Sequence, residues 1–122
     1  MILIIGIPNA GKTTYSKRYT DVVHFDNVSG TNKQMYEKVV EMVKNNPDII
    51  VEGVYDKASD RKKLVEASGV PSKCIWLDTP VETCLKREKG YRKRPEGLVI
   101  LAHKAFEPPT YAEGWDDIIV IR

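Results

Sequence analysis

The sequence is poor in the residues that build disulfides and metal centres. Its 122 residues include two cysteines and two histidines. Cys74 and Cys84 form no C-x-x-C pair, and no set of cysteine and histidine ligands accompanies them, so the sequence contains no zinc-binding pattern. We expect reduced thiols that serve packing in a cytoplasmic protein. His24 and His103 show no metal spacing with each other or with carboxylates, and we expect ordinary buried or surface histidines.

Long apolar runs and a strong net charge are also missing. The N-terminal apolar run, residues 1–7, is too short for a signal sequence and far shorter than the roughly 20 residues that cross a bilayer. The net charge is +2, so the overall field does not indicate a nucleic-acid partner, although a local cluster could. With 42% apolar residues, no repeat and no low-complexity tail, we expect one domain over residues 1–122.

Short apolar runs alternate with helical patterns along the chain. This alternation is typical of a parallel sheet built from β-α units, and it predicts an α/β fold with five strands in a three-layer sandwich. Capping boxes that begin at Thr31 and at Thr79 mark two of the helix starts. The expected strands are residues 2–5, 22–25, 49–51, 74–77 and 118–121, and the expected helices include residues 31–45, 57–67, 79–87 and 98–105.

One short motif predicts nucleotide binding. The segment from Gly6 to Thr13 fits G-x-x-x-x-G-K-[ST] and directly follows the first expected strand. In this pattern, backbone N–H groups and the positive end of the next helix bind phosphate oxygens, and glycines let the chain approach them. Lys12 would reach the β- and γ-phosphates, and the Thr13 hydroxyl would hold Mg²⁺. We expect a P-loop NTPase fold whose nucleotide-binding residues are Gly6, Pro8, Asn9, Ala10, Gly11, Lys12, Thr13 and Thr14.

Carboxylates stand at the ends of the second, third and fourth expected strands, where open parallel sheets bind ligands. Asp26 is a candidate general base for a hydroxyl that attacks the γ-phosphate; the alternative is an ordinary turn aspartate. Glu52 ends an apolar strand as a Walker B carboxylate does, and it would hold Mg²⁺ through water beside Thr13; the alternative is a solvated strand end. Asp78 fits a simpler role as an anion near a helix N-terminus.

Residues 86–95 carry the densest charge of the chain, with six basic residues among ten. Guanidinium groups from a closing segment can neutralise a transferring phosphoryl group while the segment excludes water, which predicts a lid here. Arg87 and Arg92 are candidate catalytic residues, and Arg94 is a candidate contact to the nucleotide. The alternatives are a solvated basic loop and a nucleic-acid surface on which Tyr91 stacks against a base.

Taken in order, these segments resemble the P-loop kinases related to bacteriophage polynucleotide kinase. The similarity covers nearly the whole chain, and its most specific pieces after the phosphate loop are residues 79–87 and 106–116. The resemblance implies a sheet ordered 2-3-1-4-5, ATP with Mg²⁺, Asp26 as the base and lid arginines on the donor phosphates. A phage-encoded kinase of this kind would act in the host cytoplasm. One difference is the N-V-S-G sequence after Asp26, where polynucleotide kinases usually carry an arginine.

Three functions are compatible with these features. The leading hypothesis is an ATP-dependent kinase that phosphorylates a hydroxyl of DNA or RNA, at a 5′ end or on a hydroxymethylated base. The alternative is a kinase for a small molecule such as a nucleoside, a sugar or an antibiotic. A nucleotide-dependent switch is a third class. The segment N-K-Q-M at residues 32–35 lacks the aspartate of the N-K-x-D guanine-binding pattern, which speaks against the switch.

Overall fold

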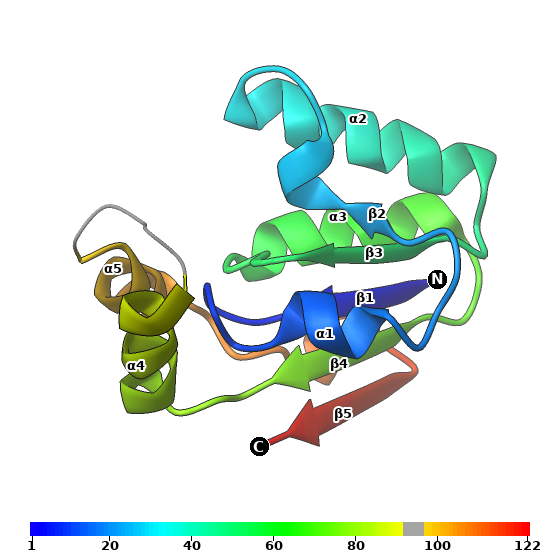
Figure 1. Ribbon diagram of the computed structural model, residues 1–122. Coiled ribbons are helices and arrows are strands. Elements are labelled where there is room, and N and C mark those ends of the chain that lie inside the picture. The colour runs from blue at the N-terminus through cyan, green and yellow to red at the C-terminus, as the bar shows by residue number, and fades with distance from the viewer. Residues whose placement is uncertain (92–96) are drawn as a thin grey trace.

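The computed structural model describes residues 1–91 and 97–122, which form an α/β fold around one parallel sheet (Figure 1). The elements, in chain order, are β1 (Ile2–Ile5), α1 (Lys12–Ser16), β2 (Val23–His24), the 3₁₀ helix η1 (Phe25–Asn27), α2 (Asn32–Asn45), β3 (Ile50–Gly53), α3 (Ala58–Ser68), β4 (Lys73–Leu77), α4 (Val81–Tyr91), α5 (Leu98–Ala105), the 3₁₀ helix η2 (Tyr111–Glu113) and β5 (Asp117–Ile121). Among the described residues, no helix has the length and apolar character needed to cross a bilayer.

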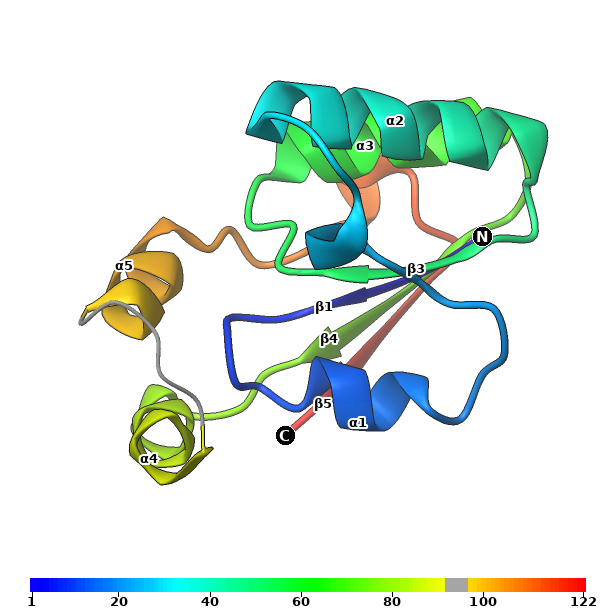
Figure 2. The same ribbon diagram turned by 45° about the horizontal axis from the view of Figure 1, so that its top comes forward.

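The strands lie in the order β2-β3-β1-β4-β5, and every neighbouring pair is parallel. The order implied by the resemblance is therefore confirmed. Helices α2 and α3 cover one face of the sheet and α1 covers the other, which gives the predicted three layers (Figure 2). Helices α4 and α5 stand beyond the carboxyl ends of the strands in both views (Figures 1 and 2). The carboxyl edge of the sheet is thus the place where β-α loops and the α4-α5 pair meet.

Strand β1 is apolar along its whole length because it lies between two layers of helices. Leu3 and Ile5 belong to the core beneath α2 and α3, whereas Ile4 belongs to the core on the α1 side. All three side chains are fully buried. A strand that is buried on both faces shows no polar alternation, which is why a short apolar run was the correct signal for it.

Local signals explain most helix boundaries. The predicted capping box at Thr31 is present, because its hydroxyl accepts the N–H of Gln34 and the Gln34 side chain accepts the N–H of Thr31. Helix α3 ends at Gly69, whose φ of 64° is the left-handed conformation that glycine adopts without strain. Helix α4 extends past the predicted end at Arg87 and reaches Tyr91. A single glycine inside a helix weakens it by only about 1 kcal/mol, so Gly90 does not stop this one.

The prediction for the second strand was wrong in length. Strand β2 comprises only Val23 and His24, and the chain then turns into η1 at Phe25. Strand β2 is an edge strand that pairs with β3 through two residues. Few ladder hydrogen bonds therefore hold it extended, and tertiary packing decides its length.

Candidate functional site

The phosphate loop follows β1 at the carboxyl edge and has the tight backbone that its motif predicts. A Cβ atom on Gly6 would lie 2.9 Å from the carbonyl oxygen of Leu77, so only glycine fits there. Gly11 has a φ of 99°, and Asn9 has a positive φ of 68°. Asparagine tolerates this left-handed region better than most residues. The backbone needed for a loop that curls around phosphate oxygens is therefore present.

Lys12 begins α1 and folds its side chain back over the phosphate loop. The side chain is 8% exposed, and its Nζ atom donates a hydrogen bond of 2.9 Å to the carbonyl oxygen of Ile7. The ammonium group thus lies at the loop in which the motif places the β- and γ-phosphates. Thr13 and Thr14 follow on the same turn and are exposed. The predicted nucleotide-binding residues thus form the loop from Gly6 to Gly11 and the first turn of α1, at the carboxyl edge of the sheet.

Helix α4 and the residue Thr79 before it make three hydrogen bonds to the phosphate loop among the described residues. Nη1 of Arg87 donates to the carbonyl oxygen of Asn9 at 2.9 Å, and Nδ2 of Asn9 donates to the carbonyl oxygen of Cys84 at 3.3 Å. The hydroxyl of Thr79 donates to the carbonyl oxygen of Ala10 at 2.8 Å. Thr79 therefore connects the start of α4 to the loop, and the helix itself begins at Val81. Arg87, which the sequence predicts as a lid residue, therefore lies at the phosphate loop, and its contact to a phosphate stays a prediction.

The other two predicted lid arginines, Arg92 and Arg94, lie outside the described residues. A cavity of about 600 Å³ opens between the phosphate loop, α1, the start of α4 and the end of β5. Arg18 and Arg87 line it together with Thr14 and Thr83. Ligand cavities are commonly 300–1,000 Å³ in volume, so this one is large enough for part of a nucleotide. Its lining combines these polar and basic side chains with apolar residues such as Leu77 and Ile121.

Glu52 lies in β3, next to β1, and its side chain reaches Thr13 in the first turn of α1. Its Oε1 atom is 3.4 Å from the hydroxyl of Thr13, and the residue is 6% exposed. The two predicted Mg²⁺ residues are therefore brought together. Groups of three or more histidine, cysteine, aspartate or glutamate side chains that could hold a metal are absent from residues 1–91 and 97–122. A Mg²⁺ ion here would need phosphate oxygens and water besides these two side chains, which is the coordination that Mg²⁺ prefers.

His24 contacts Glu52 from the neighbouring strand. Its Nδ1 atom lies 3.7 Å from Oε2 of Glu52, and the β2-β3 register sets the two residues side by side. The sequence alone predicts no site role for His24, because the contact depends on strand order and register. Once the strand order places β2 beside β3, a histidine at the end of β2 indicates a side chain close to Glu52. The imidazole faces one carboxylate oxygen while Thr13 faces the other.

We expect Glu52→Gln to raise the Mg²⁺ concentration that gives half-maximal activity by about tenfold, since groups that hold metal-bound water typically change metal affinity by this order. The amide keeps the shape of the side chain and removes its charge. The measurement is the phosphoryl-transfer rate against Mg²⁺ concentration at saturating nucleotide. Glu41→Gln is the matched control, because Glu41 is an exposed partner of Lys44 on α2. An unchanged Mg²⁺ requirement in Glu52→Gln would remove Glu52 from the metal site.

Asp26 lies on η1, directly after β2, at the carboxyl edge where the sequence analysis placed it. Its side chain is exposed, and among the described residues it makes no hydrogen bond or ion pair. The preceding residue, Phe25, packs against Tyr36 and Tyr55 with ring centroids 4.6 and 5.4 Å away. This packing anchors the short turn that carries Asp26. Asp26 therefore stays a candidate for the general base that accepts a proton from an incoming hydroxyl.

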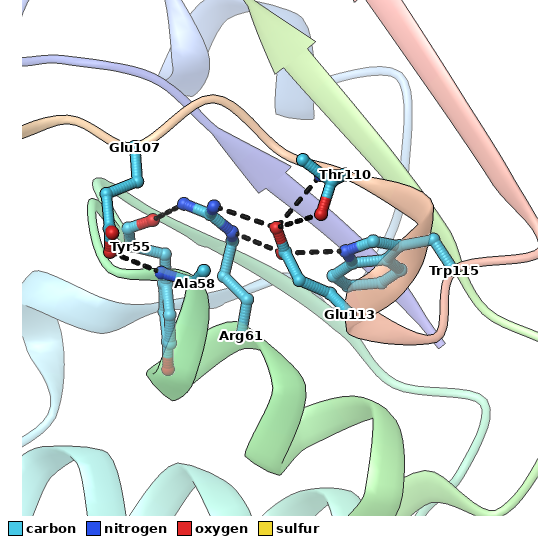
Figure 3. Close-up of polar contacts among 7 residues, drawn as sticks. All are labelled: Tyr55, Ala58, Arg61, Glu107, Thr110, Glu113 and Trp115. Carbon is cyan, nitrogen blue, oxygen red and sulfur yellow. Dashed lines mark hydrogen bonds and ion pairs between the residues drawn. The ribbon is translucent and has the colours of Figure 1, made fainter.

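A buried polar network that was not predicted from the sequence joins α3 to the segment before β5 (Figure 3). Nε and Nη2 of Arg61 donate to the two carboxylate oxygens of Glu113 at 2.7 and 3.1 Å. Nη1 of Arg61 donates to the carbonyl oxygen of Tyr55 at 2.7 Å. Glu113 also accepts the indole N–H of Trp115 at 3.1 Å and the backbone N–H of Thr110 at 2.9 Å. The one local signal was that Arg61 shares a helix face with Leu64 and Ser68, which are also buried.

The pKa of Glu113 lies below its ordinary value of 4.5. Burial alone would raise the pKa, but hydrogen bonds from Arg61, Trp115 and Thr110 favour the charged form and prevail. A lowered folded-state pKa contributes stability above the unfolded pKa, and this stability is lost as the pH falls through the folded value. The protein should therefore lose stability in acid below about pH 4.5.

We expect Glu113→Gln to lower the free energy of unfolding near neutral pH by about 3 kcal/mol, because the Arg61 charge stays buried without its partner. The variant should also show a flatter pH dependence in acid than the wild type. Urea unfolding followed over a series of pH values measures both effects. Glu66→Gln, which alters an exposed pair with Lys62 on the same helix, should change stability by less than about 1 kcal/mol. Parallel pH curves for wild type and Glu113→Gln would contradict this assignment.

Comparisons with known proteins bear on the fold. No protein-family model and no curated protein sequence matches the chain significantly. Among solved structures, a gluconokinase from Sinorhizobium meliloti 1021 superposes with a TM-score of 0.78 at 15% identity, over 98% of this chain and 79% of that one. A sugar kinase from Janibacter sp. HTCC2649 superposes with a TM-score of 0.79 at 17% identity, over 98% of this chain and 83% of that one.

The chain has the fold of these two kinases. Identities this low establish the arrangement of elements and leave the acceptor open. The two neighbours are named for small-molecule acceptors, and nothing in the comparisons points specifically to polynucleotide kinases. The prediction of fold and strand order from the sequence is therefore confirmed, whereas the resemblance to the phage enzymes gains no specific support.

Proposed function

We propose that the protein is an ATP-dependent kinase that phosphorylates a hydroxyl of a sugar or a related small polyhydroxylated molecule. The observation that carries the proposal is the joint placement of Lys12, Thr13, Glu52 and Arg87 around one phosphate loop. A cavity of about 600 Å³ adjoins this loop. The structural likeness to a gluconokinase and a sugar kinase supports a small acceptor over the nucleic acid that the sequence first suggested.

The side chains divide the reaction between them. Lys12 and the loop amides bind the donor phosphates, and Arg87 adds positive charge beside Asn9. Thr13 and Glu52 would hold Mg²⁺, which would neutralise charge on the phosphates. The acceptor oxygen forms a bond to the γ-phosphorus while the bond to the bridging oxygen breaks, and ADP leaves. Asp26 takes the proton of the acceptor hydroxyl.

A transfer screen tests the proposal. Purified protein is incubated with Mg²⁺ and ATP labelled on the γ-phosphate, together with gluconate, hexoses, pentoses, nucleosides, aminoglycosides, and plain or hydroxymethylated oligonucleotides. We expect label on a sugar or sugar-acid acceptor and little ATP hydrolysis without one, because an acceptor completes the closed site. Label on oligonucleotides alone would restore the nucleic-acid hypothesis. ATP hydrolysis that no acceptor stimulates would support the switch, and no turnover of any kind would refute the kinase.

A further inference from the structure

The loop between β3 and α3, residues 54–57, has a backbone that needs outside support. Tyr55 has a φ of 40°, and a bulky residue adopts this region only when its surroundings hold it there. Among the described residues its buried hydroxyl has no hydrogen-bond partner. Ring packing and the hydrogen bond from Arg61 to its carbonyl oxygen are therefore the contacts that orient Tyr55. Strain of this kind costs on the order of 1–3 kcal/mol, and strained residues cluster at functional sites.

This loop is packed directly against the turn that carries Asp26. The Tyr55 ring meets the Phe25 ring at 5.4 Å in an edge arrangement. A Cβ atom on Gly53 would lie 2.9 Å from the Cβ atom of Phe25, so the two backbones approach as closely as glycine allows. Glu52 precedes Gly53 and Phe25 precedes Asp26, so the loop packs against the residues next to both candidate site residues.

The support for the loop comes from the segment that joins α5 to β5. The backbone N–H of Glu107 donates to the carbonyl oxygen of Asp56 at 2.8 Å, and the Glu107 carboxylate accepts the N–H of Ala58 at 3.0 Å. Phe106, at the end of α5, stacks on Trp76 with the ring centroids 5.7 Å apart. Figure 3 shows Arg61 and Glu107 at this loop, and Glu113 on the far side of Arg61, where it accepts hydrogen bonds from the guanidinium group. The segment that follows α5 is therefore hydrogen-bonded directly to this loop.

The chemistry of the Arg61–Glu113 pair fits positioning better than bulk stability. Arg61 is fully buried and Glu113 is 5% exposed. Removing two charges from water costs about as much as their attraction returns, so apolar residues of equal size would stabilise the fold as well or better. Apolar residues could not donate the hydrogen bond to the Tyr55 carbonyl oxygen. Arg61 donates this bond, and its ion pair with Glu113 fixes the direction of the guanidinium group.

We propose that Arg61, Glu113 and Glu107 form a clamp: they are positioning residues that hold residues 54–57 in the conformation that shapes the acceptor site. The inference rests on the proposed function for its catalytic consequence. Among the described residues, none of the three makes a hydrogen bond or ion pair to the phosphate loop, so their loss should act on acceptor use and spare nucleotide binding.

Two variants test the clamp by enzyme kinetics. Arg61→Lys keeps a positive charge but loses the planar fork, and Glu107→Ala removes an exposed carboxylate that accepts the N–H of Ala58. We expect each to raise the acceptor KM about tenfold and to leave the KM for ATP within about twofold, a split that indicates lost acceptor positioning. Glu107→Gln should rescue Glu107→Ala, because its amide oxygen can accept the same bond. Lys62→Ala, which removes an exposed pair on α3, is the matched control and should change neither KM.

Hydrogen exchange supplies a readout that does not depend on activity. In Arg61→Lys and Glu107→Ala, the amides of residues 53–58 should exchange at least about tenfold faster while those of β1 and β4 keep wild-type rates. If the wild type transfers phosphate to no acceptor, the proposed function fails, and faster exchange confined to this loop still supports the clamp. Wild-type exchange in both variants would overturn the clamp. Equal rises in the KM for ATP and for the acceptor would overturn its positioning role.

Discussion

Replacing Lys12 with alanine is expected to lower the phosphoryl-transfer rate by at least about 100-fold and to weaken nucleotide binding, because it removes the ammonium that we propose binds the β- and γ-phosphates. In the structure, Lys12 is buried over the phosphate loop and donates to the carbonyl oxygen of Ile7. The substitution therefore also removes a contact that shapes the loop. Initial rates and nucleotide affinity for the purified variant measure both losses.

Lys17→Ala is the matched control for this prediction. Lys17 follows α1 and is exposed, so its removal should leave rate and affinity unchanged. Thermal unfolding of both variants distinguishes a lost function from a lost fold. A Lys12→Ala protein that is folded, binds ATP with wild-type affinity and transfers phosphate at the wild-type rate would show that the loop does not act as its motif predicts.

Asp26→Asn should leave ATP affinity near the wild-type value and reduce kcat by about 100-fold or more, because general-base catalysis contributes about that much. The amide has nearly the same shape as the carboxylate and cannot take the proton of the acceptor hydroxyl. Asp26 is exposed on η1, so the substitution should not disturb packing. Steady-state kinetics with the acceptor identified by the transfer screen, together with calorimetry for ATP, separates the two effects.

Asp48→Asn provides the comparison for Asp26→Asn. Asp48 is an exposed carboxylate that precedes β3, at the opposite edge of the sheet from the phosphate loop. Its substitution should leave kcat unchanged. If Asp26→Asn retains a near-wild-type rate, Asp26 is not the base, and another group must accept the proton.

The local part of the site could be predicted from the sequence because it depends on contiguous residues. The phosphate loop combines glycines, a lysine and a threonine at fixed spacing, and the structure shows the backbone that this spacing requires. The helix that begins at Thr31 was equally predictable, since its capping box involves residues three apart. Strand order was different. It followed from the resemblance alone, because periodicity says which segments are strands and not which strands are neighbours.

The long-range contacts were not predictable from one sequence. Arg61 and Glu113 are 52 residues apart, and no local sequence pattern around either residue indicates that the two form an ion pair. The contact between His24 and Glu52 requires the β2-β3 register, which emerges only in the folded sheet. The sequence therefore predicted the backbone of the phosphate loop, and its role in nucleotide binding stays a prediction. The comparisons leave the acceptor open.

Calorimetric titration of the protein with ATP and excess Mg²⁺ tests the nucleotide-binding role of the phosphate loop most directly. Saturable binding at one site is expected in the wild type, with clearly weaker binding in Lys12→Ala and unchanged binding in Lys17→Ala. The absence of binding heat for ATP, GTP and the other common nucleoside triphosphates, at more than one temperature, would contradict a kinase built on this loop.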